Sequence, residues 1–175
     1  KDNILIVNGD DSFLSTLKEK NYDFTIKTFG FNKENDIYCE SYELTEEDIT
    51  FVCTIDGKKE EIFIPTVGEH NIYNAMAAIL VGKSLGISIQ EIKEGLKDYT
   101  ATKMRLDIIK NDNITIINDT YNASPDSMKA ALNILGRYDS RRVAILGDMF
   151  EMGELAEYGH RLVGECTINN TDVLI

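Results

Sequence analysis

The sequence predicts an α/β fold in two consecutive parts. Short apolar segments alternate with helical patterns at both ends of the chain, which is typical of parallel sheets connected through helices. Between them, residues 36–64 alternate β-branched and polar residues around Asp56-Gly57, a pair that favours a tight hairpin turn. We therefore expect a parallel sheet with an antiparallel β excursion, followed by a second α/β unit.

The composition excludes several classes of protein. With 175 residues, 43% hydrophobic and 27% charged, the chain can build one substantial core or two small ones. A formal net charge of −12 argues against non-specific binding to nucleic acid or to anionic membranes. No apolar run approaches the roughly 20 residues of a membrane span, so we expect no membrane insertion. Three distant cysteines, Cys39, Cys53 and Cys166, form no disulfide or zinc pattern, which favours a reducing cytoplasm.

The first elements are expected to form a βαβ unit. Ile4–Val7 is a predicted strand, residues 12–20 a predicted helix, and Phe24–Phe29 a second strand. Asp10 and Asp11 lie in the polar turn after the first strand. They could be ligands or helix N-caps, and we favour capping.

Two helices should follow the β excursion. The first begins near Glu69 and stops at Gly86, and the second extends from a Ser88–Glu91 capping box to about Leu96. The first helix places apolar residues at helical spacing: Ile72, Met76, Ile79, Leu80 and Leu85. The polar connector 99–103 then marks a domain boundary, which gives predicted domains at 1–102 and 103–175.

The first turn of the first helix carries three polar side chains, His70, Asn71 and Asn74, within reach of one another. An amide offers a donor beside an acceptor, as the edge of a purine requires. The alternative is that His70 caps the helix and both asparagines face solvent.

The second part begins with Met104-Arg105-Leu106, which we expect to enter a strand. Arg105 could reach a phosphate or could be a surface charge. The chain then turns and returns as a buried strand, Ile114–Ile117, with Asp119 at its carboxyl end. A carboxylate there suits ribose or another hydroxyl-bearing ligand.

The next elements are predicted to form half of a Rossmann-like sheet. Ser124 can cap a helix from Pro125 to about Tyr138, whose free amides would attract an anion, although these residues also make ordinary turns. A strand at 143–146, a helix through about Cys166 and a strand from Asp172 follow. His160 stands alone on that helix and is assigned no catalytic role.

Three stretches in this order carry a resemblance to a known family. They are Gly68-Glu-His-Asn-Ile-Tyr-Asn-Ala-Met-Ala-Ala78, Asn118-Asp-Thr-Tyr-Asn-Ala-Ser-Pro-Asp-Ser-Met128 and Arg141-Arg-Val-Ala-Ile-Leu-Gly-Asp-Met-Phe-Glu-Met-Gly153. Together with Met104-Arg-Leu106 they closely resemble the Mur ligase family over nearly the whole chain. The resemblance implies the end of a central mononucleotide-binding α/β domain that binds ATP, followed by a truncated Rossmann-like C-terminal ligase domain.

The resemblance also implies roles for individual residues. His70, Asn71 and Asn74 match the stretch that contacts adenine, Arg105 the arginine near the ATP phosphates, and Asp119 the acidic residue near the ribose. The stretch associated with closure over a D-alanyl-D-alanine acceptor supplies four more: Asn122, Ser124, Asp126 and Ser127. The family often has Asn where this chain has Ser124. Both residues cap helices, but Ser124 has no side-chain amide with which to contact the dipeptide.

The reaction implied is ATP-dependent amide bond formation in cytoplasmic peptidoglycan precursor synthesis. The carboxylate of UDP-N-acetylmuramoyl-tripeptide would form an acyl phosphate, and the amine of D-alanyl-D-alanine would displace phosphate. Such chemistry uses a phosphate loop and Mg²⁺, yet the sequence contains no G-x-x-x-x-G-K-[ST] stretch. We therefore expect a fragment, inactive alone, whose catalytic residues and magnesium ligands lie upstream of Lys1.

Two alternatives remain open at this point. The chain could belong to another Mur-type ligase, such as a glutamate-, lysine- or diaminopimelate-adding enzyme or a folylpolyglutamate synthase. It could also be a non-catalytic nucleotide-binding module. The Asn122–Met128 run favours the dipeptide-adding branch.

Overall fold

The computed structural model describes residues 3–19, 21–100 and 102–175. Contacts divide the chain into two compact units, Lys1–Thr100 and Ala101–Ile175. Both units mix helices with strands, so the predicted α/β class is confirmed.

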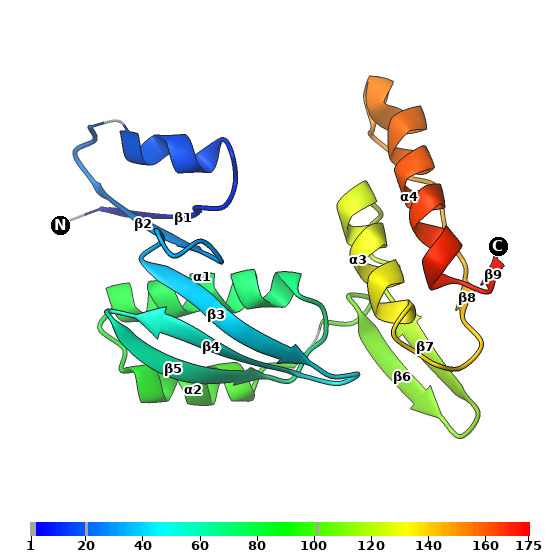
Figure 1. The fold of residues 1–175 in the computed structure, drawn as a ribbon, viewed down its shortest axis with the longest axis horizontal. Helices are drawn as coiled ribbons and strands as arrows, with labels where there is room; N and C mark the ends of the chain where they lie inside the picture. Colours follow the sequence, from blue (N-terminus) through cyan, green and yellow to red (C-terminus); the bar gives the residue numbers. More distant parts are fainter. Residues whose placement is uncertain (1–2, 20, 101) are drawn as a thin grey trace. The chain divides into compact units, whose positions relative to one another are not determined.

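The first unit contains one five-stranded sheet in the order β1-β2-β3-β4-β5 (Figure 1). Its strands are β1 (Ile4–Asn8), β2 (Thr25–Gly30), β3 (Ile37–Leu44), β4 (Ile49–Ile55) and β5 (Lys58–Ile64). The parallel pair β1–β2 and the antiparallel pairing of β3, β4 and β5 are as predicted, and β3 joins the two parts by pairing parallel with β2. Asp56 and Gly57 form the hairpin turn after β4, both with positive φ (49° and 75°), as a tight hairpin requires.

The segment between β1 and β2 differs from the prediction. Instead of an α-helix it forms a 3-10 helix, η1 (Leu14–Glu19), with no buried residue. A short helix without an apolar face to bury gains little from packing and takes the tighter form. Asp11 caps this segment, because its Oδ1 accepts hydrogen bonds of 2.9 Å from the N–H groups of Phe13 and Leu14.

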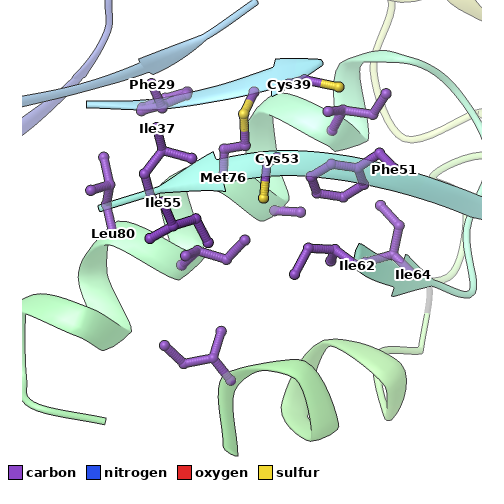
Figure 2. Packing of buried hydrophobic residues seen from close by; sticks show 14 of the residues in the cluster. Phe29, Ile37, Cys39, Phe51, Cys53, Ile55, Ile62, Ile64, Met76 and Leu80 are labelled. Atoms are coloured by element: carbon purple, nitrogen blue, oxygen red, sulfur yellow. The ribbon is translucent and has the colours of Figure 1, made fainter. Parts of the chain in front are cut away.

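Helix α1 (His70–Ser84) packs against β1, β2 and β3, and helix α2 (Ile89–Lys97) packs against β5. Figure 2 shows buried side chains of the core that these elements share. The Ser88–Glu91 capping box and the glycine after α1 are as predicted, with Gly86 at φ +81°. Leu85 was predicted on the apolar face but is 74% exposed. The reason is that α1 ends at Ser84, so Leu85 is its C-cap and turns away from the face.

The core of the first unit follows the two expected periodicities. Every second residue of β4 is buried, and α1 contributes residues at helical spacing. Its larger apolar side chains that are fully buried are Ile37, Ile49, Phe51, Cys53, Ile62, Ile72, Met76 and Ile79.

The second unit consists of a hairpin and a βαβ segment. Its elements are β6 (Asp107–Asn111), β7 (Ile114–Asn118), α3 (Pro125–Leu135), β8 (Val143–Ala144), η2 (Gly153–Leu155), α4 (Ala156–Asn170) and β9 (Val173–Leu174). Strands β8 and β9 pair in parallel around α4, which is the predicted half of a Rossmann-like arrangement. Helices α3 and α4 pack together over a small core of Leu132, Ala144, Met149 and Val163.

Three predictions for this unit were wrong. Met104–Leu106 forms a turn, with Met104 and Leu106 at φ 62° and 47°, and not the start of a strand. Ile114–Ile117 is not a buried strand, since Ile114 is 63% exposed: β7 pairs only with β6, and no described element of this unit covers that side chain. The helix after Pro125 ends at Leu135, where Gly136 caps it.

None of the described helices combines the length and the apolar character needed to cross a bilayer. The three cysteines are free thiols, two of them buried in β3 and β4. Burial raises the pKa of Cys39 to about 11 and that of Cys53 to about 12, which keeps both protonated.

His160 fixes the loop that follows β8. Its Nδ1 lies 2.7 Å from the Ala156 carbonyl, and its Nε2 lies 2.5 Å from Asp148 Oδ1 and 3.2 Å from the Met149 nitrogen. The protonated ring donates from Nδ1 to the Ala156 carbonyl and from Nε2 to Asp148. The neutral ring still donates from Nδ1, but its Nε2 can only accept a hydrogen bond from the Met149 N–H and no longer donates to Asp148. The contacts to Ala156 and Asp148 raise the pKa of His160 above its ordinary value.

We expect this pair to stabilise the second unit more at low pH. The raised pKa means that the added stability is fully present below the unfolded-state pKa of about 6.5 and disappears as the pH rises through the folded-state pKa. An NMR titration of the His160 ring should give a pKa above 6.5. Asp148→Asn should lower it, and an unchanged value in that variant would contradict the pairing.

Candidate functional site

The first turn of α1 is organised by a chain of side-chain amides. Asn71 Nδ2 donates to the Val67 carbonyl at 2.7 Å, and Asn74 Nδ2 donates to Asn71 Oδ1 at 2.9 Å. Gly68, at φ +91°, makes the sharp turn from which the helix starts. His70 and Asn74 are exposed while Asn71 is half-buried, so the turn presents the side chains of His70 and Asn74 to solvent.

A β-bulge in β3 brings a tyrosine to this turn. The register shifts between Cys39 and Ser41, so Tyr42 pairs with the buried Phe51 and shares its face of the sheet. From there the Tyr42 hydroxyl donates to Glu69 Oε2 at 2.5 Å. This bond ties the residue before α1 to the sheet.

Asp10 also anchors this helix. Its carboxylate accepts hydrogen bonds from the Phe31 and Asn32 amides, at 2.5 and 3.1 Å, and from Asn35 Nδ2 at 2.9 Å. It also accepts one of 3.0 Å from the hydroxyl of Tyr73, which lies on α1. Asp10 therefore cross-links two loops and a helix, and it is not an N-cap.

The electrostatics of this carboxylate agree with that role. Loss of hydration raises the pKa of Asp10, but the donors from Phe31, Asn32, Tyr73 and Asn35 outweigh it and hold the pKa below its ordinary value. Burial and the nearby Asp10 charge raise the pKa of the Tyr73 phenol, so Tyr73 remains a donor.

Arg105 and Asp119 form a second cluster in the second unit. Asp119 Oδ1 accepts a 3.0 Å hydrogen bond from the Leu106 amide, so it closes the turn that carries Arg105. The exposed Arg105 guanidinium lies over the Tyr121 ring, with Cζ 4.2 Å from the ring centroid. Cation and carboxylate therefore belong to one local structure.

The predicted acceptor residues lie at the start of α3. Ser124 and Ser127 form a capping box, with Ser127 N donating to Ser124 Oγ at 3.4 Å and Ser124 N to Ser127 Oγ at 3.1 Å. This confirms Ser124 as the helix cap. Asp126 is almost fully exposed and lies 3.6 Å from Lys129, and Asn122 is exposed.

The sequence patterns missed three features of these clusters. They gave no sign of the Asp10–Tyr73 bond, of the Tyr42–Glu69 bond or of the contact between Arg105 and Tyr121. Each depends on residues that meet only after folding. A shallow polar hollow of about 570 Å³, lined in part by Lys18 and Tyr22, contains none of the predicted residues.

Among residues 3–19, 21–100 and 102–175, no three His, Cys, Asp or Glu side chains lie close enough together to hold a metal ion. No residue of this part of the chain is assigned to magnesium.

Comparison with known families gives two matches. The family model of the Mur ligase middle domain matches residues 1–82, and that of the Mur ligase, glutamate ligase domain matches residues 104–175. Among curated proteins, the UDP-N-acetylmuramoyl-tripeptide--D-alanyl-D-alanine ligase of Bacillus subtilis is 40% identical over 94% of this chain and 35% of its own length. The enzyme of the same name from Haemophilus influenzae is 32% identical over 94% of this chain and 36% of its own.

Solved structures agree with the sequence matches. MurF from Acinetobacter baumannii superposes with a TM-score of 0.89 at 29% identity and covers 98% of this chain and 38% of that one. MurF from Thermotoga maritima in complex with ADP superposes with a TM-score of 0.84 at 20% identity and covers 99% of this chain and 40% of that one. At this identity the match supports the fold alone. The chain spans 35% and 36% of the length of the two curated relatives. On the strength of both family matches, the chain belongs to the Mur ligase family.

Proposed function

We propose that this chain is part of an ATP-dependent ligase that joins D-alanyl-D-alanine to UDP-N-acetylmuramoyl-tripeptide. The observation that carries the proposal is the similarity to relatives named for this reaction, 40% and 32% identical over 94% of the chain. We assign residues 1–102 to the central ATP-binding domain and 103–175 to the C-terminal ligase domain. The parent enzyme would act in the cytoplasm, in cell-wall precursor synthesis, with Mg²⁺ bound outside the described residues.

The α1 turn would hold the adenine base. The amide of Asn71 is already engaged by Val67 and Asn74, so its task is to orient its neighbour. Asn74 and His70 are exposed and would contact the base edge, where an amide can donate and accept side by side.

Arg105 and Asp119 would hold the rest of the nucleotide. A guanidinium offers paired N–H donors that suit phosphate oxygens, so Arg105 would stabilise the charge that develops on the transferred γ-phosphoryl group. Asp119 would lie near the ribose and, through Leu106, keeps the turn that carries Arg105 in shape.

The reaction would then proceed in two steps, formation of an acyl phosphate and formation of the amide. A carboxylate oxygen of the tripeptide attacks the γ-phosphorus, and ADP leaves to give an acyl phosphate. The amine of D-alanyl-D-alanine attacks the acyl carbon, loses a proton and expels inorganic phosphate, forming the amide. Asn122, Ser124, Asp126 and Ser127 would border the dipeptide in this second step.

The acceptor is tested by ADP release from the intact ligase that contains this chain. With Mg-ATP and UDP-N-acetylmuramoyl-tripeptide, we expect ADP release that depends on D-alanyl-D-alanine and not on free glutamate or diaminopimelate. Release with a free amino acid would place the enzyme in another branch of the family. No release under any condition would favour a non-catalytic nucleotide-binding module.

The base contact is tested by Asn74→Ala in the same enzyme. Loss of one hydrogen-bonding amide should raise the KM for ATP about two- to ten-fold. Gln90→Ala is the matched control, because Gln90 is also an exposed helical amide of the first unit. Equal KM values for ATP in both variants would remove Asn74 from the site.

The acceptor contact is tested by Asn122→Ala, which should raise the KM for D-alanyl-D-alanine about two- to ten-fold and leave that for ATP unchanged. Asn169→Ala, an exposed position on α4, serves as the control. No change in the dipeptide KM would contradict the assignment of Asn122.

Ser124 needs a separate comparison because it caps α3. Ser124→Ala should lower the free energy of unfolding by about 1 kcal/mol, and Ser124→Asn should retain the cap. A dipeptide KM that is lower in Ser124→Asn than in the unsubstituted enzyme indicates direct contact at this position. A KM that is raised in Ser124→Ala and unchanged in Ser124→Asn assigns the effect to the cap.

A further inference from the structure

We infer that Tyr121 is a positioning residue, whose ring holds the Arg105 guanidinium and ties it to the loop that leads into α3. This inference rests on the proposed function, because it extends the role of Arg105. Tyr121 was not among the predicted site residues, although it lies between Asp119 and Asn122.

The contact between the two side chains is direct. Arg105 Cζ lies 4.2 Å from the centroid of the Tyr121 ring, well inside the roughly 6 Å range of a cation–π contact. Tyr121 is 60% exposed, so its ring contributes little to a core and is available on the surface. Because water screens an exposed cation–π contact, its loss should have only a modest effect on the binding of ATP.

The backbone joins the same two segments. The Tyr121 amide donates to the Met104 carbonyl at 3.2 Å, and the Leu106 amide donates to Asp119 Oδ1 at 3.0 Å. Met104 and Leu106 both have positive φ. Residues other than glycine rarely adopt this backbone conformation, so neighbouring contacts must maintain it. Both backbone neighbours of Arg105 are therefore fixed to the loop that follows β7.

The contact with Tyr121 suits an arginine that must bind phosphate. Cζ of Arg105 lies over the ring, and the guanidinium carries five N–H donors. A phosphate can therefore bind donors that do not face the ring while the contact with Tyr121 remains. Because the same loop leads to Asn122 and Ser124, a movement of the loop around the acceptor would also move Arg105.

The inference predicts a specific kinetic effect in the intact ligase. Tyr121→Leu should raise the KM for ATP about two- to five-fold, the fold-change expected for loss of an exposed cation–π contact, with a smaller change in kcat. Tyr121→Phe keeps the ring and should restore the KM. Tyr158→Leu is the control, because Tyr158 is 62% exposed on α4 and should leave the KM unchanged.

A double-mutant cycle with Arg105→Ala separates the outcomes. We expect Tyr121→Leu to have no further effect on the KM for ATP once Arg105 is replaced. If Arg105→Ala raises the KM but Tyr121→Leu does not, or if their effects multiply, the positioning role is wrong and the proposed function stands. If neither Arg105→Ala nor Asn74→Ala changes the KM for ATP, the proposed nucleotide site itself is wrong.

Discussion

The carboxylate of Asp10 is the contact on which the arrangement of the first unit depends. It joins the loop after β1, the loop after β2 and Tyr73 of α1. The loops can approach this closely only because glycines line the contact: a Cβ at Gly30 would lie 2.4 Å from the Asp10 carboxylate. One at Gly9 would lie 1.8 Å from Asn35 Oδ1. An aspartate and two glycines thus fix α1 against these two loops.

Aspartates that follow strands make similar contacts in the second unit. Asp119 follows β7 and binds the Leu106 amide, and Asp148 follows β8 and binds His160. In each case the side chain of an aspartate after a strand accepts a hydrogen bond from a neighbouring segment and holds a loop in place. Aspartates at strand ends suggest ligands from sequence alone, but in this fold their described contacts also fix the loops that carry the candidate binding groups.

Local chemistry explains what the sequence could predict. The Ser88–Glu91 box, the Ser124 cap and the Asp56-Gly57 turn involve residues at most three positions apart, so their patterns are sufficient. The exposure of Ile114–Ile117 could not be predicted, because an apolar run does not reveal what covers it. For the candidate site, the residue types of the α1 turn were visible. Its support by Tyr42 was not, because it depends on the register shift in β3.

The exposed candidate groups are therefore held by neighbours and not by burial. Asn71 orients Asn74, and Tyr121 orients Arg105, so each binding group keeps free donors while its neighbour restricts its motion. A long side chain that is already ordered loses less conformational entropy when a ligand binds, a saving of about 0.5–1.5 kcal/mol for each side chain. Such weak contacts order the exposed candidate groups without enclosing them.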